Sequence, residues 1–159
     1  MSTRPYPIRI ADFVTEDGIN IAVQEMGEGR PLILIHGYFS DADTNWIKYG
    51  HAALLAGAGY RVIMPDLRAH GKSDKPHHPQ FYTPDVLADD QFALIEELGL
   101  TDYDLGGYSL GGRTVARMLV RGATPRRAII SGMGLEGLLQ PGQRADHFRH
   151  ILTNLGSHE

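Results

Sequence analysis

Apolar and polar residues follow two different periods along this chain, and segments of the two kinds alternate. Unbroken apolar runs of strand length are typical of strands buried on both faces of a parallel sheet, and segments with apolar residues three and four apart are typical of helices. The predicted strands are residues 31–35, 60–64, 103–107 and 127–131. The predicted helices between them are residues 45–56, 86–98 and 110–120.

This alternation predicts an α/β fold. Strand, helix and strand in succession imply a mostly parallel sheet with right-handed crossovers and helices on both faces. Residues 8–13 and 19–24 precede it as two short segments around Glu16-Asp17-Gly18, a pattern that predicts a hairpin with an Asp-Gly turn. In such sheets the chemistry lies beyond the carboxyl ends of the strands.

The helical spacing also predicts which side chains reach the core. Two predicted helices supply most of these contacts, and the inward residues are Trp46, Ala53, Leu54 and Leu55 in one and Val115, Met118 and Leu119 in the other. The strand at 127–131 is centred on Ala128-Ile129-Ile130, and this run predicts burial on both faces.

One stretch combines a strand end, a sharp corner and a helix start. It reads Gly107-Tyr108-Ser109-Leu110-Gly111 and matches the G-x-S-x-G nucleophile elbow. The elbow strains the serine backbone so that its oxygen stands clear, and side chains at Gly107 or Gly111 would collide with neighbouring elements. The free N–H groups of the following helix would stabilise a negative charge beside Ser109. With 19 glycines in 159 residues, the motif alone is equally compatible with a plain strand–helix turn.

The composition excludes several classes of function. The net charge of −4 and the absence of a basic run argue against a nucleic-acid partner. The chain has no cysteine, which excludes disulfides, thiolate metal sites and a cysteine nucleophile. No His, Asp or Glu spacing indicates a metal, and we expect no cofactor. We found neither a signal-like segment nor an apolar run of membrane-spanning length, so we expect a cytoplasmic protein without a membrane partner.

Three motifs now fall at the ends of three predicted strands, in a fixed order. They are His36-Gly37-Tyr38-Phe39, the loop that begins Asp66-Leu67-Arg68-Ala69-His70, and the elbow. Together they resemble the α/β-hydrolase superfamily, in the serine-nucleophile branch that includes esterases, lactonases, C–C bond hydrolases and cofactor-free perhydrolases. The resemblance runs from about residue 8 to about residue 138.

The resemblance implies roles for individual residues. Ser109 would be the nucleophile, the backbone N–H groups of Tyr38 and Leu110 would form the oxyanion hole, and Gly37 would allow a close approach of the substrate. His36 is an alternative base, but the family's histidine at this place is structural, and its base comes last in the chain.

The second motif has a supporting role in this resemblance. Asp66, Arg68 and His70 resemble a hydrogen-bonded brace under the elbow loop. The family often has glycine where this chain has Ala69.

The resemblance leaves the rest of a catalytic triad unassigned. In the family, the acid and the histidine follow the serine in that order, and the residues after Ser131 offer no clear match to either. We therefore expect an N-terminal portion of such a fold: a core over residues 1–134, truncated after the strand that follows the nucleophile helix, and the start of a cap over residues 135–159. Residues 144–155 are a predicted helix that carries His147 and His150 as alternative bases.

Two functions stay open at this point. The first is a serine hydrolase that acts through an acyl-enzyme on an ester-like or other small carbonyl substrate. The second is a catalytically silent module that binds a small apolar ligand or a partner. In the family's sheet two more strands follow the strand at 127–131, so in this shorter chain we expect that strand to become an edge strand, which could pair with another molecule.

Overall fold

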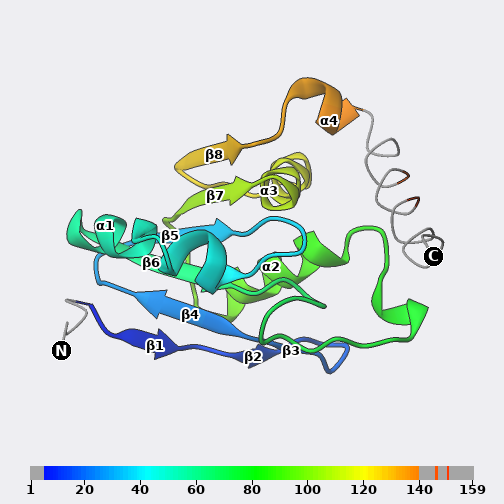
Figure 1. The fold of residues 1–159 in the computed structure, drawn as a ribbon, viewed down its shortest axis with the longest axis horizontal. Coiled ribbons are helices and arrows are strands. Elements are labelled where there is room, and N and C mark those ends of the chain that lie inside the picture. The colour runs from blue at the N-terminus through cyan, green and yellow to red at the C-terminus, as the bar shows by residue number, and fades with distance from the viewer. Residues whose placement is uncertain (1–5, 140–145, 147–149, 151–159) are drawn as a thin grey trace, which may run out of the picture.

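A computed structural model describes residues 6–139, 146 and 150, and its centre is a six-stranded sheet (Figure 1). The strands of this sheet follow the order β1-β4-β6-β5-β7-β8. Their bounds are Ile8–Ile10 (β1), Val23–Met26 (β4), Arg30–Ile35 (β5), Tyr60–Pro65 (β6), Asp104–Tyr108 (β7) and Arg127–Ser131 (β8). Strands β6, β5, β7 and β8 run parallel, so their carboxyl ends meet at one edge, as the alternating pattern predicted.

Helices lie on both faces of the sheet. Their bounds are His51–Gly57 (α1), Val86–Glu97 (α2), Leu110–Val120 (α3) and Leu135–Leu139 (α4), with a π-helical turn at Asp43–Ile47 (η1) and a 3₁₀ turn at Pro79–Phe81 (η2). The predicted helix at residues 144–155 lies outside the described residues, apart from Asp146 and His150.

The predicted hairpin is present, but it is divided into two pairs of strands. Strand β1 pairs with β4, and a second ladder joins β2 (Phe13–Val14) to β3 (Asn20–Ile21) next to the turn at Gly18, where φ is 83°. Between the two ladders, the N–H of Ala11 donates to the carbonyl of Val23. The hairpin thus extends the parallel sheet at one edge by antiparallel pairing with β6.

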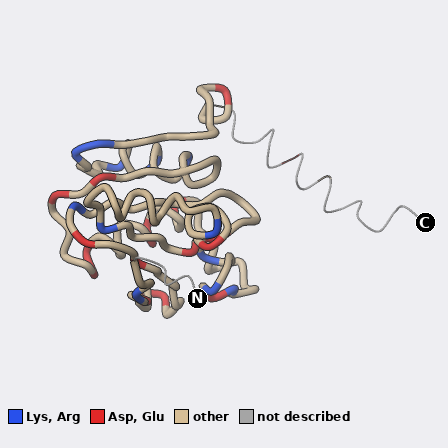
Figure 2. The backbone as a smooth tube through the Cα atoms, turned by 60° about the vertical axis from the view of Figure 1, so that its left-hand side comes forward, with Lys and Arg blue, Asp and Glu red and all other residues tan. Residues whose placement is uncertain are grey.

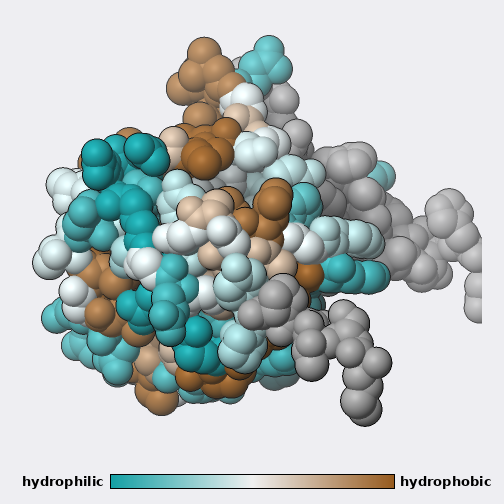
Figure 3. Space-filling model, turned by 90° about the vertical axis from the view of Figure 1, so that its left-hand side faces the viewer, coloured by the Kyte–Doolittle hydropathy of each residue, from teal (hydrophilic) through white to brown (hydrophobic). Residues whose placement is uncertain are grey.

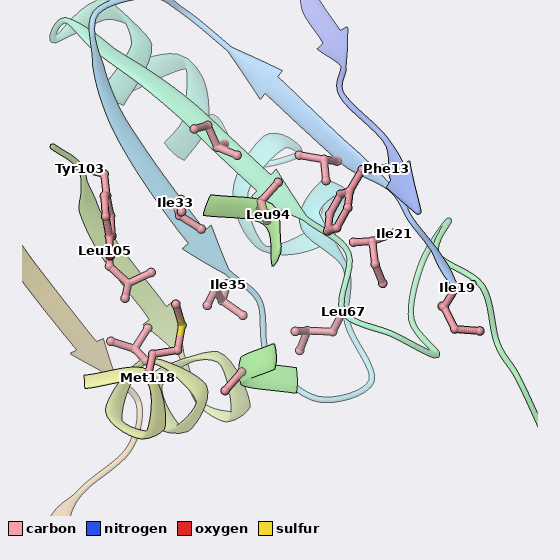
Figure 4. Close-up of a cluster of buried hydrophobic side chains, with 14 residues drawn as sticks. Phe13, Ile19, Ile21, Ile33, Ile35, Leu67, Leu94, Tyr103, Leu105 and Met118 are labelled. Carbon is pink, nitrogen blue, oxygen red and sulfur yellow. The ribbon is translucent and has the colours of Figure 1, made fainter. Parts of the chain in front are cut away.

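The period of two along the strands divides the core into two clusters. Ile33 and Ile35 of β5 face α2 and α3, where they join Leu94, Leu105 and Met118 (Figure 4). The alternate residues of β5 face η1 and α1, where they join a second cluster. Its buried members are Met26, Leu32, Leu34, Ala42, Ile47, Ala52, Ala56, Val62 and Met64.

Two of the predicted core contacts are wrong. The first predicted helix is interrupted at Gly50, where φ is 87°, and α1 restarts at His51. The restart places Ala52 and Ala56 inward, four residues apart, and leaves Leu54 74% exposed on the opposite side. In α3, Val115 and Met118 are buried as predicted, but Leu119 is exposed.

Strand β8 was predicted to be buried on both faces, and this is also wrong. Among the described strands it lies at the edge of the sheet, as was also expected, and all five of its residues are exposed. In Figure 3, hydrophobic residues gather at the top of the molecule, the end at which Figure 1 places β8 and α4.

Acidic and basic residues are interspersed along the described backbone, without a continuous basic run (Figure 2). Within residues 6–139, no helix has the length and hydropathy that a membrane span requires.

Candidate active site

Ser109 occupies the corner between β7 and α3. Its backbone has φ of 53° and ψ of −112°, a strained conformation for a residue with a side chain. Strand β7 ends at Tyr108 and α3 begins at Leu110, so the turn consists of this one residue. The elbow geometry that the motif predicted is therefore present.

The two glycines of the motif allow the close contacts that hold this corner. A Cβ atom at Gly107 would overlap the backbone of Gly111, and one at Gly111 would overlap the carbonyl of Ile35. Helix α3 thus packs directly against the ends of β5 and β7, with no room for a side chain. This packing fixes where the first turn of the helix lies relative to Ser109.

The loop after β5 lies against the elbow. A Cβ atom at Gly37 would be 3.5 Å from the Cβ of Ser109 and 3.3 Å from a ring carbon of Tyr108, so the two segments are in contact. The side chain of Asn45 accepts a hydrogen bond of 2.8 Å from the N–H of Gly37 and holds this loop in place. Sequence reasoning missed Asn45 as a support of this loop, because an amide at a helix start is common and carries no specific signal.

The loop that follows Gly37 is strained and aromatic. Phe39 has φ of 54°, and its ring lies 4.1 Å from the ring of Tyr38, centroid to centroid. Both rings are exposed at the carboxyl edge of the sheet. Leu110 is the first residue of α3. Its N–H is therefore one of the first-turn N–H groups, which have no carbonyl partner within the helix.

A further hydrogen bond ties the elbow to the edge strand. The N–H of Ser109 donates to the carbonyl of Ser131 at 2.8 Å. The last residue of β8 therefore helps to hold the backbone of the corner. The hydroxyl of Ser109 forms no hydrogen bond with any described residue.

His36 is buried, and both of its ring nitrogens have partners. Its Nδ1 lies 2.7 Å from the carbonyl of Gly37, and its Nε2 accepts a hydrogen bond of 2.9 Å from the N–H of Leu67. These partners define a neutral ring with the proton on Nδ1. Burial lowers the pKa of His36 and keeps the ring neutral. His36 is therefore a connector between the loops after β5 and β6 and has no nitrogen left for Ser109.

The side chain of Asp66 also connects the loops that follow β5 and β6. One carboxylate oxygen accepts from the N–H of Ala42, and the other accepts from the N–H of Lys72, each at 2.8 Å. The hydroxyl of Ser73 donates to the carbonyl of Asp66 at 2.6 Å. Asp66 thus supports the loop after β5, whereas the expected brace was under the elbow loop, which these hydrogen bonds do not reach.

Arg68 has a different role from the expected one. Its guanidinium is buried, and it donates two hydrogen bonds to Asp90 of α2 and two to Asp17 of the hairpin turn. It also donates to the carbonyl of Phe81 at 2.8 Å. These partners place Arg68 between the hairpin, α2 and η2, away from the elbow. The pKa of Asp17 is lowered, chiefly by its hydrogen bonds with Arg68, whereas burial raises the pKa of Asp90.

Ala69 and His70 complete this loop. Ala69 has φ of 68°, which explains why glycine suits this position better. The ring of His70 lies 5.2 Å from the ring of His36 and 5.7 Å from that of Tyr38, and its Nδ1 lies 3.0 Å from the carbonyl of Arg68. His70 therefore packs under the aromatic loop.

The described part of the chain holds a serine corner and its supporting loops, but it shows neither a base hydrogen-bonded to Ser109 nor a metal-binding group of His, Asp and Glu. The predicted alternative base His147 lies outside the described residues. His150 is described, and its backbone is helical.

Comparison with known proteins decides the family. The model of the alpha/beta hydrolase fold family matches residues 30–147, which include all three motifs. The chain belongs to the alpha/beta hydrolase fold family. A non-heme haloperoxidase of Rhodococcus erythropolis is 35% identical over 156 residues, which cover 89% of this chain and 54% of that protein.

Other relatives carry different names. Epoxide hydrolase 2 of Siraitia grosvenorii is 33% identical over 99 residues, which cover 62% of this chain and 30% of that protein. The crystal structure of an epoxide hydrolase from Vigna radiata superposes with a TM-score of 0.64 at 28% identity and covers 76% of this chain and 36% of that one. The chain thus spans between about a third and a half of the length of these relatives, and its fold corresponds to part of theirs.

Proposed function

We propose that this chain carries the nucleophile and the oxyanion hole of a serine hydrolase that acts on an ester-like or other small carbonyl substrate. The observation that carries the proposal is the backbone of Ser109, held at φ of 53° between β7 and α3. A strained serine at a strand–helix corner presents its oxygen to the space beyond the sheet and lies beside the positive end of α3.

The chemistry would proceed in two steps. The Oγ of Ser109 attacks the carbonyl carbon, and a base takes the hydroxyl proton. The carbonyl oxygen becomes negative and accepts hydrogen bonds from the N–H groups of Leu110 and Tyr38. The leaving group then departs with a proton, and water releases the acyl group from Ser109. The base and its acid would come from outside the described residues.

Two features support a small substrate with an apolar part. Tyr38 and Phe39 form an exposed aromatic wall next to Gly37. A groove of about 750 Å³ extends between α2, α3 and α4; its lining includes Leu110, next to Ser109, but not Ser109 itself. Its volume is within the usual range for small-molecule sites. The relatives bear the names of both haloperoxidases and epoxide hydrolases, so family membership leaves the substrate open.

Labelling with a fluorophosphonate probe tests the nucleophile. We expect slow labelling of the 159-residue chain at Ser109, located by peptide mass analysis, and none at this site in Ser109→Ala. Thr101→Ala removes an exposed hydroxyl before the start of β7, at the other end of the strand from Ser109, and serves as the matched control. Labelling that is equally strong in Ser109→Ala would overturn the assignment.

The rate of hydrolysis of an activated ester tests the missing base. Without the base we expect only a residual acceleration of roughly 10³–10⁴ over water, from oxyanion stabilisation and binding. Fast turnover that is lost in Ser109→Ala would instead mean that a residue beyond Leu139, such as His147 or His150, completes the site.

The second candidate function is a silent binding module. The observation that favours it is the hydroxyl of Ser109, which has no hydrogen-bond partner among the described residues. Complete absence of labelling at Ser109, together with saturable binding of an apolar dye that bulky residues at Leu110 or Leu135 weaken, would support this candidate over the hydrolase.

A further inference from the structure

The ring of Tyr108, the last residue of β7, lies between two glycines at the carboxyl edge of the sheet. A Cβ atom placed on Gly37 would lie 3.3 Å from Cδ1 of this ring, and one placed on Gly132 would lie 2.5 Å from Cε2. These two atoms are on opposite edges of the ring. The ring therefore fills the space between the loop after β5 and the residue that follows β8.

The register of the sheet explains why the ring lies there. In β7, Gly106 pairs with Leu34 of β5 on one side and with Ile129 of β8 on the other. Side chains two apart in a strand share a face, so Tyr108 points to the same face as Gly106, away from α3. An aromatic residue beside glycines of neighbouring strands can lay its ring over them. One ring thus covers the ends of three adjacent strands (Figure 1).

On one side the ring contacts the peptide unit that carries the N–H of Tyr38. The N–H of Gly37 donates to Asn45 at 2.8 Å, and Nδ1 of His36 donates to the carbonyl of Gly37 at 2.7 Å. The peptide bond is trans, so the N–H of Tyr38 points away from that carbonyl. The two hydrogen bonds set how this peptide is turned, and the ring of Tyr108 limits how closely it approaches the elbow.

On the other side the ring contacts the peptide unit that holds the backbone of Ser109. The carbonyl of Ser131 accepts from the N–H of Ser109 at 2.8 Å. This carbonyl belongs to the peptide between Ser131 and Gly132, and Gly132 has φ of 65°. The ring of Tyr108 therefore touches two backbone units, one on each side of the nucleophile.

We propose that Tyr108 is a positioning residue of the oxyanion hole and that its ring sets the distance between the N–H of Tyr38 and Ser109. This inference rests on the proposed function, in which that N–H stabilises the negative oxygen. An oxyanion donor acts only within about 2.7–3.1 Å of the oxygen, and a displacement of about 1 Å can cost roughly 10²-fold in rate. The ring acts through its shape, so the hydroxyl of Tyr108 is not required.

Backbone amide NMR tests the contact without using the reactivity of Ser109. In Tyr108→Ala we expect faster hydrogen exchange of the Gly37 N–H and a shifted resonance of the Tyr38 N–H. Tyr108→Phe keeps the ring and should resemble the parent chain at both amides. Tyr49→Ala removes an exposed tyrosine from the turn after η1 and serves as the matched control. Tyr108 belongs to neither core cluster, so its removal leaves the core in place.

The rate of labelling by a fluorophosphonate tests the consequence for the site. The phosphoryl oxygen of the probe takes the place of the carbonyl oxygen in the oxyanion hole. Loss of one oxyanion donor costs roughly 10²–10³-fold in rate, so a displaced donor should slow labelling of Tyr108→Ala by about tenfold or more. Tyr108→Phe and Tyr49→Ala should label at the parent rate.

A double-mutant cycle shows whether the ring carries the effect. Gly132→Ala places a methyl group against the ring, displaces it toward Gly37 and should slow labelling. In the Tyr108→Ala background the same methyl group has no ring to displace, so the further slowing should be smaller. The backbone strain of alanine at φ of 65° is present in both backgrounds and cancels in the cycle.

Three results would overturn the proposal. They are unchanged amides at Gly37 and Tyr38 in Tyr108→Ala, equal slowing of labelling in Tyr108→Phe and Tyr108→Ala, and additive effects in the cycle. If Tyr108→Ala does not fold, Gly132→Ala supplies the same amide comparison, and an unchanged Tyr38 resonance would again contradict the proposal. If Ser109 of the parent chain takes no label, the proposed hydrolase fails, and the amides alone decide whether the ring holds the loop.

Discussion

The Nε2 atom of His36 accepts a hydrogen bond of 2.9 Å from the backbone N–H of Leu67, and this contact fixes the histidine as a neutral ring inside the protein. It joins the ends of β5 and β6 at a distance from solvent. Only the unprotonated nitrogen can accept this bond, so protonation of His36 would break the link between the two loops.

This contact makes stability depend on pH. Burial lowers the pKa of His36 below its usual value of 6.5. The unfolded chain then binds a proton that the folded chain does not, so the free energy of unfolding falls as the pH drops below about 6.5. Urea denaturation at several values between pH 5.5 and 7.5 measures this slope.

A variant isolates the contribution of His36. His36→Gln should be less stable near neutral pH but should show a shallower slope in this range. His51→Gln, at an exposed histidine, should keep the slope of the parent chain. An unchanged slope in His36→Gln would show that another group causes the pH dependence.

The contact between Gly111 and Ile35 predicts a large effect of a single methyl group. Gly111→Ala places a Cβ atom against the carbonyl of Ile35 and should lower the free energy of unfolding by roughly 1–3 kcal/mol. Gly134→Ala is the control, because nothing lies within 4 Å of that position, and it should change stability by less than about 0.5 kcal/mol. Chemical denaturation of both variants gives the comparison, and equal stability would contradict the close packing of α3.

The buried ion pair between Arg68 and Asp90 predicts a larger loss of stability, when one partner is removed, than a more exposed ion pair does. Arg68→Met leaves Asp90 charged and buried, and should cost roughly 3–5 kcal/mol. Asp89→Asn breaks the more exposed pair with Arg121 and should cost about 1 kcal/mol or less. The midpoints of urea unfolding separate the two. Similar losses of stability in both variants would mean that burial does not determine how much the ion pair of Arg68 contributes to the free energy of unfolding.

The positive φ of Ala69 predicts a stabilising substitution. Ala69→Gly removes the clash of the Cβ atom in this conformation and should raise the free energy of unfolding by up to about 1 kcal/mol, less the entropy that glycine gains when unfolded. Ala58→Gly, at an exposed residue with φ of −89°, should instead lower it. Thermal melts measure both variants. Melting temperatures that shift in the same direction would contradict this explanation.

Most of the sheet could be predicted from the sequence because its central strands are unbroken apolar runs. The elbow was also predictable, since its spacing is a recognisable local motif, even though Gly107 contacts Gly111 within the motif while Gly111 contacts the distant Ile35. Leu54 and Leu119 were misplaced for a different reason. A short helix has no fixed phase in the sequence, and Gly50 resets the phase of α1.

The partners of Arg68 and Gly37 were beyond prediction. Asp17 and Asp90 lie 51 and 22 residues from Arg68 along the chain, and any of several acidic residues could have served. The bond from Gly37 to Asn45 likewise depends on the shape of η1, which apolar spacing does not reveal. Side-chain hydrogen bonds between distant segments thus became visible only in the structure.

The order of strands also determines when the sheet can form during synthesis. Strands β4 and β5 are made in succession but are not neighbours, because β6 pairs with both of them. A nascent chain that ends at β5 therefore lacks the strand that joins them, and the centre of the sheet can close only when β6 leaves the ribosome. Strands β7 and β8 then add outward, one at a time, each onto a strand that is already in place. Folding that follows synthesis in this way would keep the apolar surface of each new strand exposed only briefly.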